Sequence, residues 1–246
     1  MGQILAVCSG KGGTGKTTVC AAVASCLAAD GARVLCIDAD VGLRNLDISL
    51  GMSELATISF TDVMRGSYRL EEATQNEEIP GLFLLTSPTT ESAASISKKE
   101  FGVLLEQVRK EFDYCLIDAP AGLGAGFELA TAFADSVLMI AMSDPASMRD
   151  ASRAADKLTL MGKSDVRLIV NRITPVMYRK LRLTVDDVMD EVGLPLVGIV
   201  PDDTNVIFAA ARGVPLILFT DRGASVAALN IARRLAGRKI RLMKIR

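Results

Sequence analysis

Ser9–Thr18 reads S-G-K-G-G-T-G-K-T-T, a glycine-rich stretch between two apolar segments. It fits the pattern G-x-x-x-x-G-K-[ST], with Gly10, Gly15, Lys16 and Thr17 at the fixed positions. Loops of this pattern wrap backbone N–H groups around nucleotide phosphates; the lysine reaches the β- and γ-phosphates and the hydroxyl binds Mg²⁺. Glycine is needed because a Cβ would block the close approach of the backbone. The stretch therefore predicts a phosphate-binding loop.

The segments on either side of the loop support this prediction. Gln3–Cys8 (Q-I-L-A-V-C) is a short apolar run that is typical of a buried strand, and Thr17–Ala29 has apolar residues at helical spacing. Strand, glycine loop and helix in this order favour a nucleotide site over a glycine-rich turn. We therefore predict that ATP and Mg²⁺ bind here and that the nucleotide contacts Gly10, Lys11, Gly12, Gly13, Thr14, Gly15, Lys16, Thr17 and Thr18.

The composition limits the class of protein. The chain has 246 residues, half of them apolar, which suits one α/β domain with a large core. It contains no histidine, so catalysis by histidine and metal sites built from histidine are excluded. The five cysteines lie in apolar segments without a C-x-x-C pair, which indicates buried, reduced thiols. No apolar run approaches the roughly 18 residues of a membrane-spanning helix, and no secretory signal is recognisable.

Short apolar runs alternate with helical patterns along the chain. The predicted strands after the loop are Arg33–Asp38, Gly81–Thr86, Asp113–Asp118, Ser136–Ala141, Val166–Asn171 and Leu196–Val200. The predicted helices between them include Lys98–Phe112, Gly126–Ala134, Pro145–Met161 and Thr184–Glu191. This alternation predicts an α/β fold, a doubly wound, mostly parallel sheet flanked by helices in a single domain. Ligands of such sheets bind beyond the carboxyl ends of the strands.

Three aspartates lie at the ends of predicted strands. Asp118 ends an apolar strand, which suits a metal residue that acts through a water; the alternative is an ordinary turn aspartate. Asp38 and Asp40 are two residues apart, so an extended chain points both side chains to one side, toward the metal. The alternative is that one of the two only caps the following turn. Thr17 and Asp118 are therefore predicted metal residues, and Asp38 and Asp40 are both expected on the side of the metal.

The loop and the first of these aspartate segments resemble a known family. K-G-G-T-G-K-T resembles the deviant phosphate loop of the MinD/ParA family of P-loop ATPases, and the resemblance implies that Lys11 crosses a dimer interface to the partner's nucleotide. D-A-D-V-G-L-R-N-L-D, starting at Asp38, resembles the first switch region of the MinD branch. It implies that Asp38 lies near the Mg²⁺ shell and that Asp40 orients the attacking water. The implied catalytic residues are Lys11, Lys16 and Asp40.

Two further segments are similar to the same family. D-A-P-A-G at 118–122 is similar to the second switch, D-[ST]-P-A-G, although Ala119 lacks the usual hydroxyl. The resemblance also implies that the ends of two later strands hold the adenine, which points to Asn171, Arg172, Pro201 and Asp203. Asp203 has the alternative role of a helix N-cap.

Residues 237–246 form a basic tail behind the predicted ATPase domain at 1–236. Seven of the 28 basic residues lie in Arg233–Arg246, which has no acid, although the net charge of the chain is only −1. On one helix through this segment, Ile231, Leu235, Leu242 and Ile245 would fall on a common face. The tail is interpreted as the solvated end of a helix, a nucleic-acid arm or a membrane-surface helix. The arm is disfavoured because no aromatic residue is interleaved, and MinD-like proteins end in a membrane helix. The predicted membrane side chains are Ile240, Leu242, Met243 and Ile245.

The resemblance implies a MinD-like cytoplasmic ATPase that forms a homodimer with ATP. It would associate peripherally with the anionic inner face of the cell membrane and recruit a division inhibitor of the MinC type. Ser143–Asp150 resembles the family's dimer face, but it is shorter and lacks the acid that usually follows the proline. Two alternatives stay open, namely a ParA-like partitioning ATPase that binds DNA and a nucleotide-gated scaffold with little turnover. Nucleic acid is not the expected partner.

Overall fold

The computed structural model of the chain describes residues 1–41, 44–89, 91–176, 180 and 183–244. Eight strands form one sheet in the order β3-β4-β2-β5-β1-β6-β7-β8. All adjacent pairs are parallel except β3 with β4, which is antiparallel. The strands are β1 Gln3–Cys8, β2 Val34–Asp38, β3 Thr74–Gln75, β4 Leu82–Leu85, β5 Tyr114–Asp118, β6 Ser136–Ala141, β7 Val166–Ile173 and β8 Leu196–Pro201.

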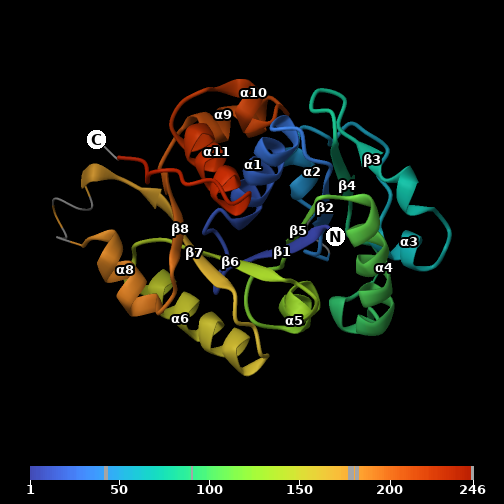
Figure 1. Cartoon of the computed structure of the whole chain (residues 1–246), viewed down its shortest axis with the longest axis horizontal. Coiled ribbons are helices and arrows are strands. Elements are labelled where there is room, and N and C mark those ends of the chain that lie inside the picture. The colour runs from blue at the N-terminus through green and yellow to red at the C-terminus, as the bar shows by residue number, and fades with distance from the viewer. Residues whose placement is uncertain (42–43, 90, 177–179, 181–182, 245–246) are drawn as a thin grey trace.

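Helices cover both faces of the sheet, so the fold has three layers (Figure 1). One face carries α3 Phe60–Met64, α4 Lys98–Glu111, α5 Ala125–Ala132, α6 Pro145–Leu160 and α8 Val185–Val192. The other face carries α1 Lys16–Ala29, α2 Leu46–Ser49, α9 Asn205–Ala211, α10 Leu216–Phe219 and α11 Ala224–Leu235. Two short 3-10 helices, η1 and η2, lie at Leu70–Glu72 and Ala93–Ser95.

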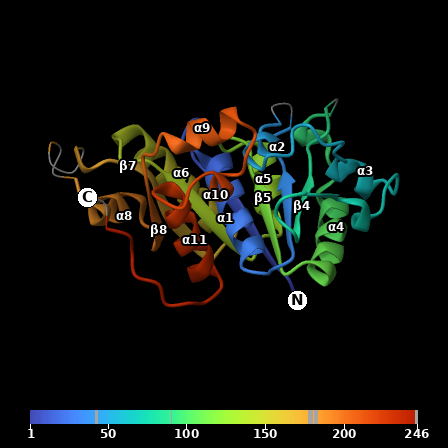
Figure 2. The same ribbon diagram turned by 90° about the horizontal axis from the view of Figure 1, so that it is seen from above.

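The alternation of side chains along each strand produces two separate cores. In β1, Ile4 and Cys8 lie in the core beneath α4, α5 and α6, whereas Leu5 and Val7 lie in the core beneath α1 and α11. α1 and α11 lie side by side on that second face (Figure 2). A central parallel strand must therefore be apolar throughout, which is the pattern that the sequence displays.

Local sequence determines where the longer helices begin and end. α6 begins where the side chain of Asp144 accepts the N–H of Ser147, with Pro145 in the first turn. α8 follows a capping box between Thr184 and Asp187 and ends at Gly193, which takes the left-handed conformation. These ends agree with the predicted helices.

The predicted fold class is confirmed as a doubly wound, mostly parallel sheet in a single domain. Apart from α11, which was predicted to continue into the tail, the long strands and helices were predicted with ends that differ only slightly. α2, α3, β3, α9 and α10 were not predicted, because elements this short do not complete enough turns or alternations to produce a periodic signal.

The basic tail does not continue the last helix. α11 ends at Leu235, Gly237 takes the left-handed conformation with φ 79°, and residues 238–244 follow without helix or strand. The prediction of one helix with Ile231 and Leu242 on a common face is therefore wrong for this structure. Ile245 lies outside the described residues.

Arg234 holds the tail beside the outer strand of the sheet. Its guanidinium donates hydrogen bonds to the carbonyl oxygens of Val197 in β8 (2.9 Å), Ile240 (2.9 Å) and Arg241 (2.6 Å). The tail runs from α11 past this edge (Figure 2). Tertiary hydrogen bonds thus replace the helical ones that the sequence pattern predicted.

The predicted membrane side chains differ in exposure. Ile240 is half-buried, Met243 packs against the core, and Leu242 is 49% exposed. Within the described residues, no helix has both the length and the apolar character that crossing a membrane requires.

Gly198 in β8 allows α11 to approach the sheet closely, and this contact can be tested. A Cβ at this position would lie 2.3 Å from Cγ1 of Ile231. Gly198→Ala should therefore lower the free energy of unfolding by about 1–3 kcal/mol in urea denaturation. In an Ile231→Ala background the added methyl group has room, so most of that loss should disappear. Equal losses in both backgrounds would contradict this packing.

Candidate nucleotide site

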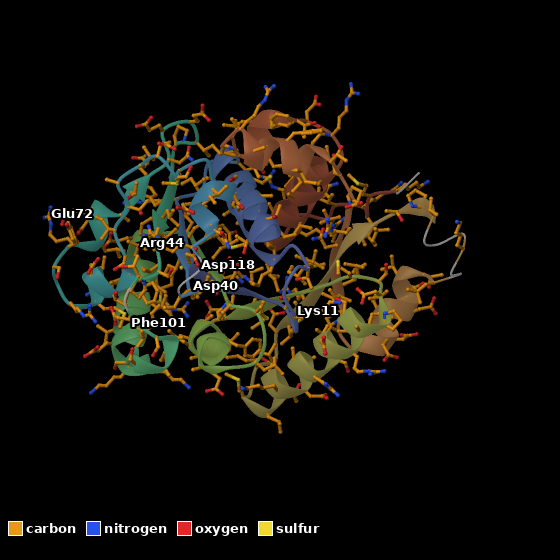
Figure 3. The ribbon with its side chains drawn as sticks, turned by 180° about the vertical axis from the view of Figure 1, so that it is seen from behind. Lys11, Asp40, Arg44, Glu72, Phe101 and Asp118 are labelled. Carbon is orange, nitrogen blue, oxygen red and sulfur yellow. The ribbon has the colours of Figure 1, made fainter. Side chains whose placement is uncertain are left out.

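Three strand ends meet at one edge of the sheet. β1 leads into the phosphate loop, while β2 and β5 end in Asp38 and Asp118, which are register partners on adjacent strands. Asp40 follows β2 and lies near Asp118, with Lys11 at the same edge (Figure 3). The predicted phosphate, metal and catalytic residues are therefore brought together at the carboxyl ends of parallel strands.

Close backbone contacts hold the phosphate loop in place. A Cβ on Gly10 would lie 2.2 Å from the carbonyl oxygen of Asp150 in α6, so only glycine fits there. Gly15, with φ 84°, precedes α1, and a Cβ there would lie 2.3 Å from the side-chain amide nitrogen of Asn171. The loop is thus fixed between α6 and the end of β7.

The lysine of the loop pairs with the aspartate at the end of β5. Nζ of Lys16 lies 2.6 Å from Oδ1 of Asp118, and the hydroxyl of Thr17 donates to Oδ2 of Asp118 at 2.6 Å. Lys16 is 7% exposed and Asp118 is 1% exposed, so the ion pair is buried. Burial raises the pKa of the Asp118 carboxyl, while Lys16 and Thr17 favour its charged form.

Asp38 is held by backbone N–H groups. Its Oδ1 accepts a hydrogen bond from the N–H of Asp40 at 2.9 Å, and its Oδ2 accepts one from Leu46 at 3.3 Å. Burial, followed by the charge of Asp118, raises the pKa of Asp38 to about 6. The Asp38 carboxylate therefore caps the turn after β2, which is the role given above as the alternative to metal binding. It also places a second buried carboxylate beside Asp118.

Asp40 lies close enough to the phosphate loop for the charge of Lys16 to affect its carboxyl group. It is half-buried; burial raises the pKa of its carboxyl and Lys16 lowers it. Residues 42–43 of the same switch segment lie outside the described residues.

The donor atoms at this edge suit Mg²⁺. No group of three Asp, Glu, Cys or His side chains that could hold a metal ion occurs in the described part of the chain. Mg²⁺, however, keeps several waters and takes only one or two carboxylates beside phosphate oxygens. The Thr17 hydroxyl and the Asp38 and Asp118 carboxylates are oxygen donors of this kind, and the two carboxylates lie on adjacent strands.

Lys11 forms an ion pair within its own chain. Its Nζ lies 3.1 Å from Oδ1 of Asp144, the residue that caps α6. Burial raises the pKa of Asp144, but the N–H of Ser147 and the charge of Lys11 outweigh that effect and lower it. Lys11 is 30% exposed and Asp144 36%, so water still reaches the pair. The acidic residue that pairs with Lys11 thus comes directly before Pro145 in the sequence, and the residue directly after this proline is not acidic.

An irregularity in β7 brings Asn171 to the phosphate loop. The register between β7 and β8 shifts between Val170 and Ile173, and Arg172 has a φ of 57°. Nδ2 of Asn171 donates to the carbonyl oxygen of Thr14 at 2.7 Å. β7 therefore runs past its predicted end at Asn171, and the bulge aims the amide at the loop.

A cavity of about 590 Å³ opens beside the loop. Its volume is typical of small-molecule sites, about 300–1,000 Å³. The residues predicted to hold the adenine all line it, together with two loop residues, namely Asn171, Arg172, Pro201, Asp203, Gly15 and Thr18. Much of the remaining wall is apolar and suits the flat face of a base.

Asp203 also has the structural role that a capping residue would have. Its Oδ1 accepts the N–H of Asn205 at the start of α9 at 2.9 Å, and its Oδ2 accepts the N–H of Ala224 at the start of α11, also at 2.9 Å. The carboxylate therefore joins two helices that form the wall of the cavity.

The other residues of the cavity wall could not be predicted from the sequence. Ile207 of α9, Leu216 of α10 and Ala228 of α11 line the cavity, but α9 and α10 are too short for a periodic pattern. The pairing of Lys11 with Asp144 is equally hidden, because the two residues are 133 positions apart.

A parallel sheet with a glycine loop between its first strand and helix, and with aspartates at neighbouring strand ends, defines a P-loop nucleotide-binding protein. Comparisons with known proteins narrow this class. A family described as an AAA domain matches residues 2–167. The septum site-determining protein MinD of Synechocystis sp. is 38% identical over 245 residues, which cover 98% of this chain and 91% of that protein.

Solved structures agree with this result. A chain of the MinC:MinD cell division protein complex of Aquifex aeolicus is 34% identical, with a TM-score of 0.91 and 99% of each chain covered. The septum site-determining protein MinD of Pyrococcus horikoshii, complexed with Mg-ADP, is 25% identical, with a TM-score of 0.83 and 96% of each chain covered. The chain therefore belongs to the MinD family of cell-division ATPases.

The raised pKa of Asp38 predicts how the stability of the metal-free protein depends on pH. The folded state binds the Asp38 proton more tightly than the unfolded state, whose pKa is near 3.8, so this carboxyl destabilises the fold as pH rises through about 6. Asp38→Asn should therefore be close to the parent in stability below pH 4 and gain up to about 3 kcal/mol above pH 6. Denaturant titration in a chelator at several pH values measures this difference. A pH-independent difference would contradict the assignment.

Proposed function

We propose that this protein binds and hydrolyses Mg-ATP at the site described, and that ATP closes a homodimer across the carboxyl edge of the sheet. The observation that carries the proposal is the buried ion pair of Lys16 and Asp118, with the Thr17 hydroxyl bonded to the same carboxylate, beside the cavity of about 590 Å³. A buried lysine at a glycine loop provides charge for phosphate oxygens, and the adjacent cavity provides room for a base.

The residues at this site would have different roles in nucleotide binding and in ATP hydrolysis. Lys16 would exchange its contact with Asp118 for the β- and γ-phosphates, while Asn171 keeps the loop tied to β7. Thr17, Asp38 and Asp118 would hold Mg²⁺, whose charge neutralises the phosphate oxygens and so favours hydrolysis. Asp40, half-buried and near Lys16, would orient the attacking water.

Lys11 is the residue proposed to reach the second subunit. Its ion pair with Asp144 is partly open to water, and a pair of this kind contributes little to stability, so Lys11 can exchange partners at low cost. In the dimer Lys11 would contact the nucleotide bound by the partner. The resulting charge neutralisation couples dimerisation to the presence of ATP.

Partners are proposed from the relatives and from the tail. A relative of known structure was solved as a MinC:MinD complex, so a MinC-like division inhibitor is the proposed protein partner. The basic tail, with Leu242 exposed, is the proposed contact with the anionic inner face of the cell membrane. Two tails in one dimer would bind with higher avidity than one tail.

Nucleotide binding is the first test of this function. Lys16→Ala removes the cation that faces the phosphates, so affinity for both ADP and a non-hydrolysable ATP analogue should fall by about 10- to 100-fold in calorimetry. Thermal unfolding serves as the control, because the same change leaves Asp118 buried without its ion-pair partner. Lys11→Ala should instead retain ADP affinity and lose ATP-dependent dimerisation in light scattering. Undiminished ATP binding by the Lys16 variant would overturn the assignment.

Membrane association is tested by sedimentation with vesicles containing phosphatidylglycerol. Leu242→Glu should reduce ATP-dependent co-sedimentation because it places a carboxylate in the basic tail, and added salt should weaken the parent interaction. Leu160→Glu is the matched control, since Leu160 is 89% exposed and belongs to the end of α6, not to the tail. If Leu242→Glu sediments as well as the parent, the tail is not the membrane contact. Sedimentation with DNA instead of vesicles would favour a partitioning ATPase.

A further inference from the structure

α6 contacts both loops of the nucleotide site. At its start, Asp144 pairs with Lys11, and the backbone of Asp150 lies directly against Gly10 of the phosphate loop. Farther along the same helix, Lys157 reaches residues 119–124, the loop that follows Asp118. One rigid element therefore touches the phosphate loop and the second switch at the same time.

Lys157 makes two strong contacts with its ammonium group. Nζ donates a hydrogen bond to the carbonyl oxygen of Leu123 at 2.6 Å and lies 2.8 Å from Oε1 of Glu128 in α5. It also lies 5.9 Å from the centre of the Phe127 ring. The side chain is 28% exposed, so both contacts are partly shielded from water. Glu128 thus positions the ammonium group of Lys157, which also donates a hydrogen bond to the loop at 119–124.

A second lysine makes the same ion pair without reaching the loop. Nζ of Lys98, in α4, lies 2.9 Å from Oε2 of Glu128. The two lysines together lower the pKa of Glu128 to about 2. Lys98 and Lys157 are therefore matched in their contact with Glu128, and the hydrogen bond to Leu123 distinguishes them.

The loop that Lys157 holds lies against the phosphate loop. A Cβ on Gly12 would be 3.8 Å from the Cβ of Ala121, so the two loops are neighbours. At Gly122 and Gly124, by contrast, no atom of the described residues other than the chain neighbours lies within 4 Å of where a Cβ would be. The loop therefore runs from the buried Asp118 to Gly122 and Gly124, which have open space around them. Leu123 lies between these two glycines, and its carbonyl oxygen accepts the hydrogen bond from Lys157.

We propose that Lys157 is a positioning residue for the hydrolysis of ATP. By fixing the Leu123 carbonyl, it holds loop 119–124 where its backbone meets the terminal phosphate of a nucleoside triphosphate. Through α6, the same contact links the state of that loop to the Lys11–Asp144 pair. This inference rests on the proposed ATPase function. ADP lacks the γ-phosphate, so Lys157 should affect the binding of ATP and leave that of ADP unchanged.

The test compares two nucleotides in matched variants of the full chain. Lys157→Met keeps an apolar stem and removes the ammonium group, whereas Lys98→Met removes only an ion pair to Glu128. Calorimetry gives dissociation constants for ADP and for a non-hydrolysable ATP analogue, and phosphate release gives kcat. For Lys157→Met we expect the ratio of analogue affinity to ADP affinity to fall about tenfold, with a similar fall in kcat. Lys98→Met should leave the ratio and kcat unchanged.

Two further variants keep the test decisive. Lys157→Gln, a neutral polar replacement, should change the ratio in the same direction and can be used if the methionine variant does not fold. Glu128→Gln removes both ion pairs but leaves Lys157 able to bond Leu123, so its ratio should stay closer to the parent than that of Lys157→Met.

The outcomes separate this inference from the proposed function. If Lys157→Met weakens both nucleotides equally, or neither, Lys157 only stabilises the fold and the inference is wrong. An identical change in Lys98→Met would assign the effect to the ion network, and the inference would again fail. If the parent protein binds neither nucleotide, it is the proposed function that fails.

Discussion

The buried ion pair between Lys16 and Asp118 is the constraint on which the site depends. The two residues come from the first helix and the fifth strand, 102 positions apart in the chain, and their charged atoms are 2.6 Å apart. Removing one member of such a pair typically costs about 3–5 kcal/mol, because the other charge remains buried. The contact thereby ties the start of α1, and the loop that precedes it, to the end of β5. In this arrangement Asp118 provides the negative charge that phosphate oxygens would provide to the same lysine.

Where the sequence predicted well, the signal was local. The phosphate loop follows a pattern of eight consecutive residues, and the central strands are apolar except at their ends because helices cover both of their faces. The aspartates at 38 and 118 could be placed because parallel strands bring their carboxyl ends to the same edge. These features need no knowledge of distant contacts.

The features that were missed depend on contacts between distant segments. The partner of Lys11 is 133 residues away, and Leu123 and Lys157 lie in different elements whose packing no periodicity reveals. In the tail, distant contacts instead made a local prediction wrong. Its apolar spacing suggested a helix, but Gly237 ends α11 and Arg234 offers hydrogen bonds at the edge of the sheet. Tertiary hydrogen bonds can thus override a weak helical preference.

The position of the tail has a consequence for how the protein avoids self-association. An open sheet has two edge strands, and unpaired N–H and C=O groups on such strands can recruit strands from other molecules. At one edge of this sheet β3 is only two residues long, which leaves little to pair with. At the other edge, the Val197 carbonyl of β8 is occupied by Arg234, and the tail lies alongside. If the tail leaves to make the proposed contact with a membrane, β8 loses part of its cover, so the proposed membrane contact and the protection of this edge would depend on the same few residues.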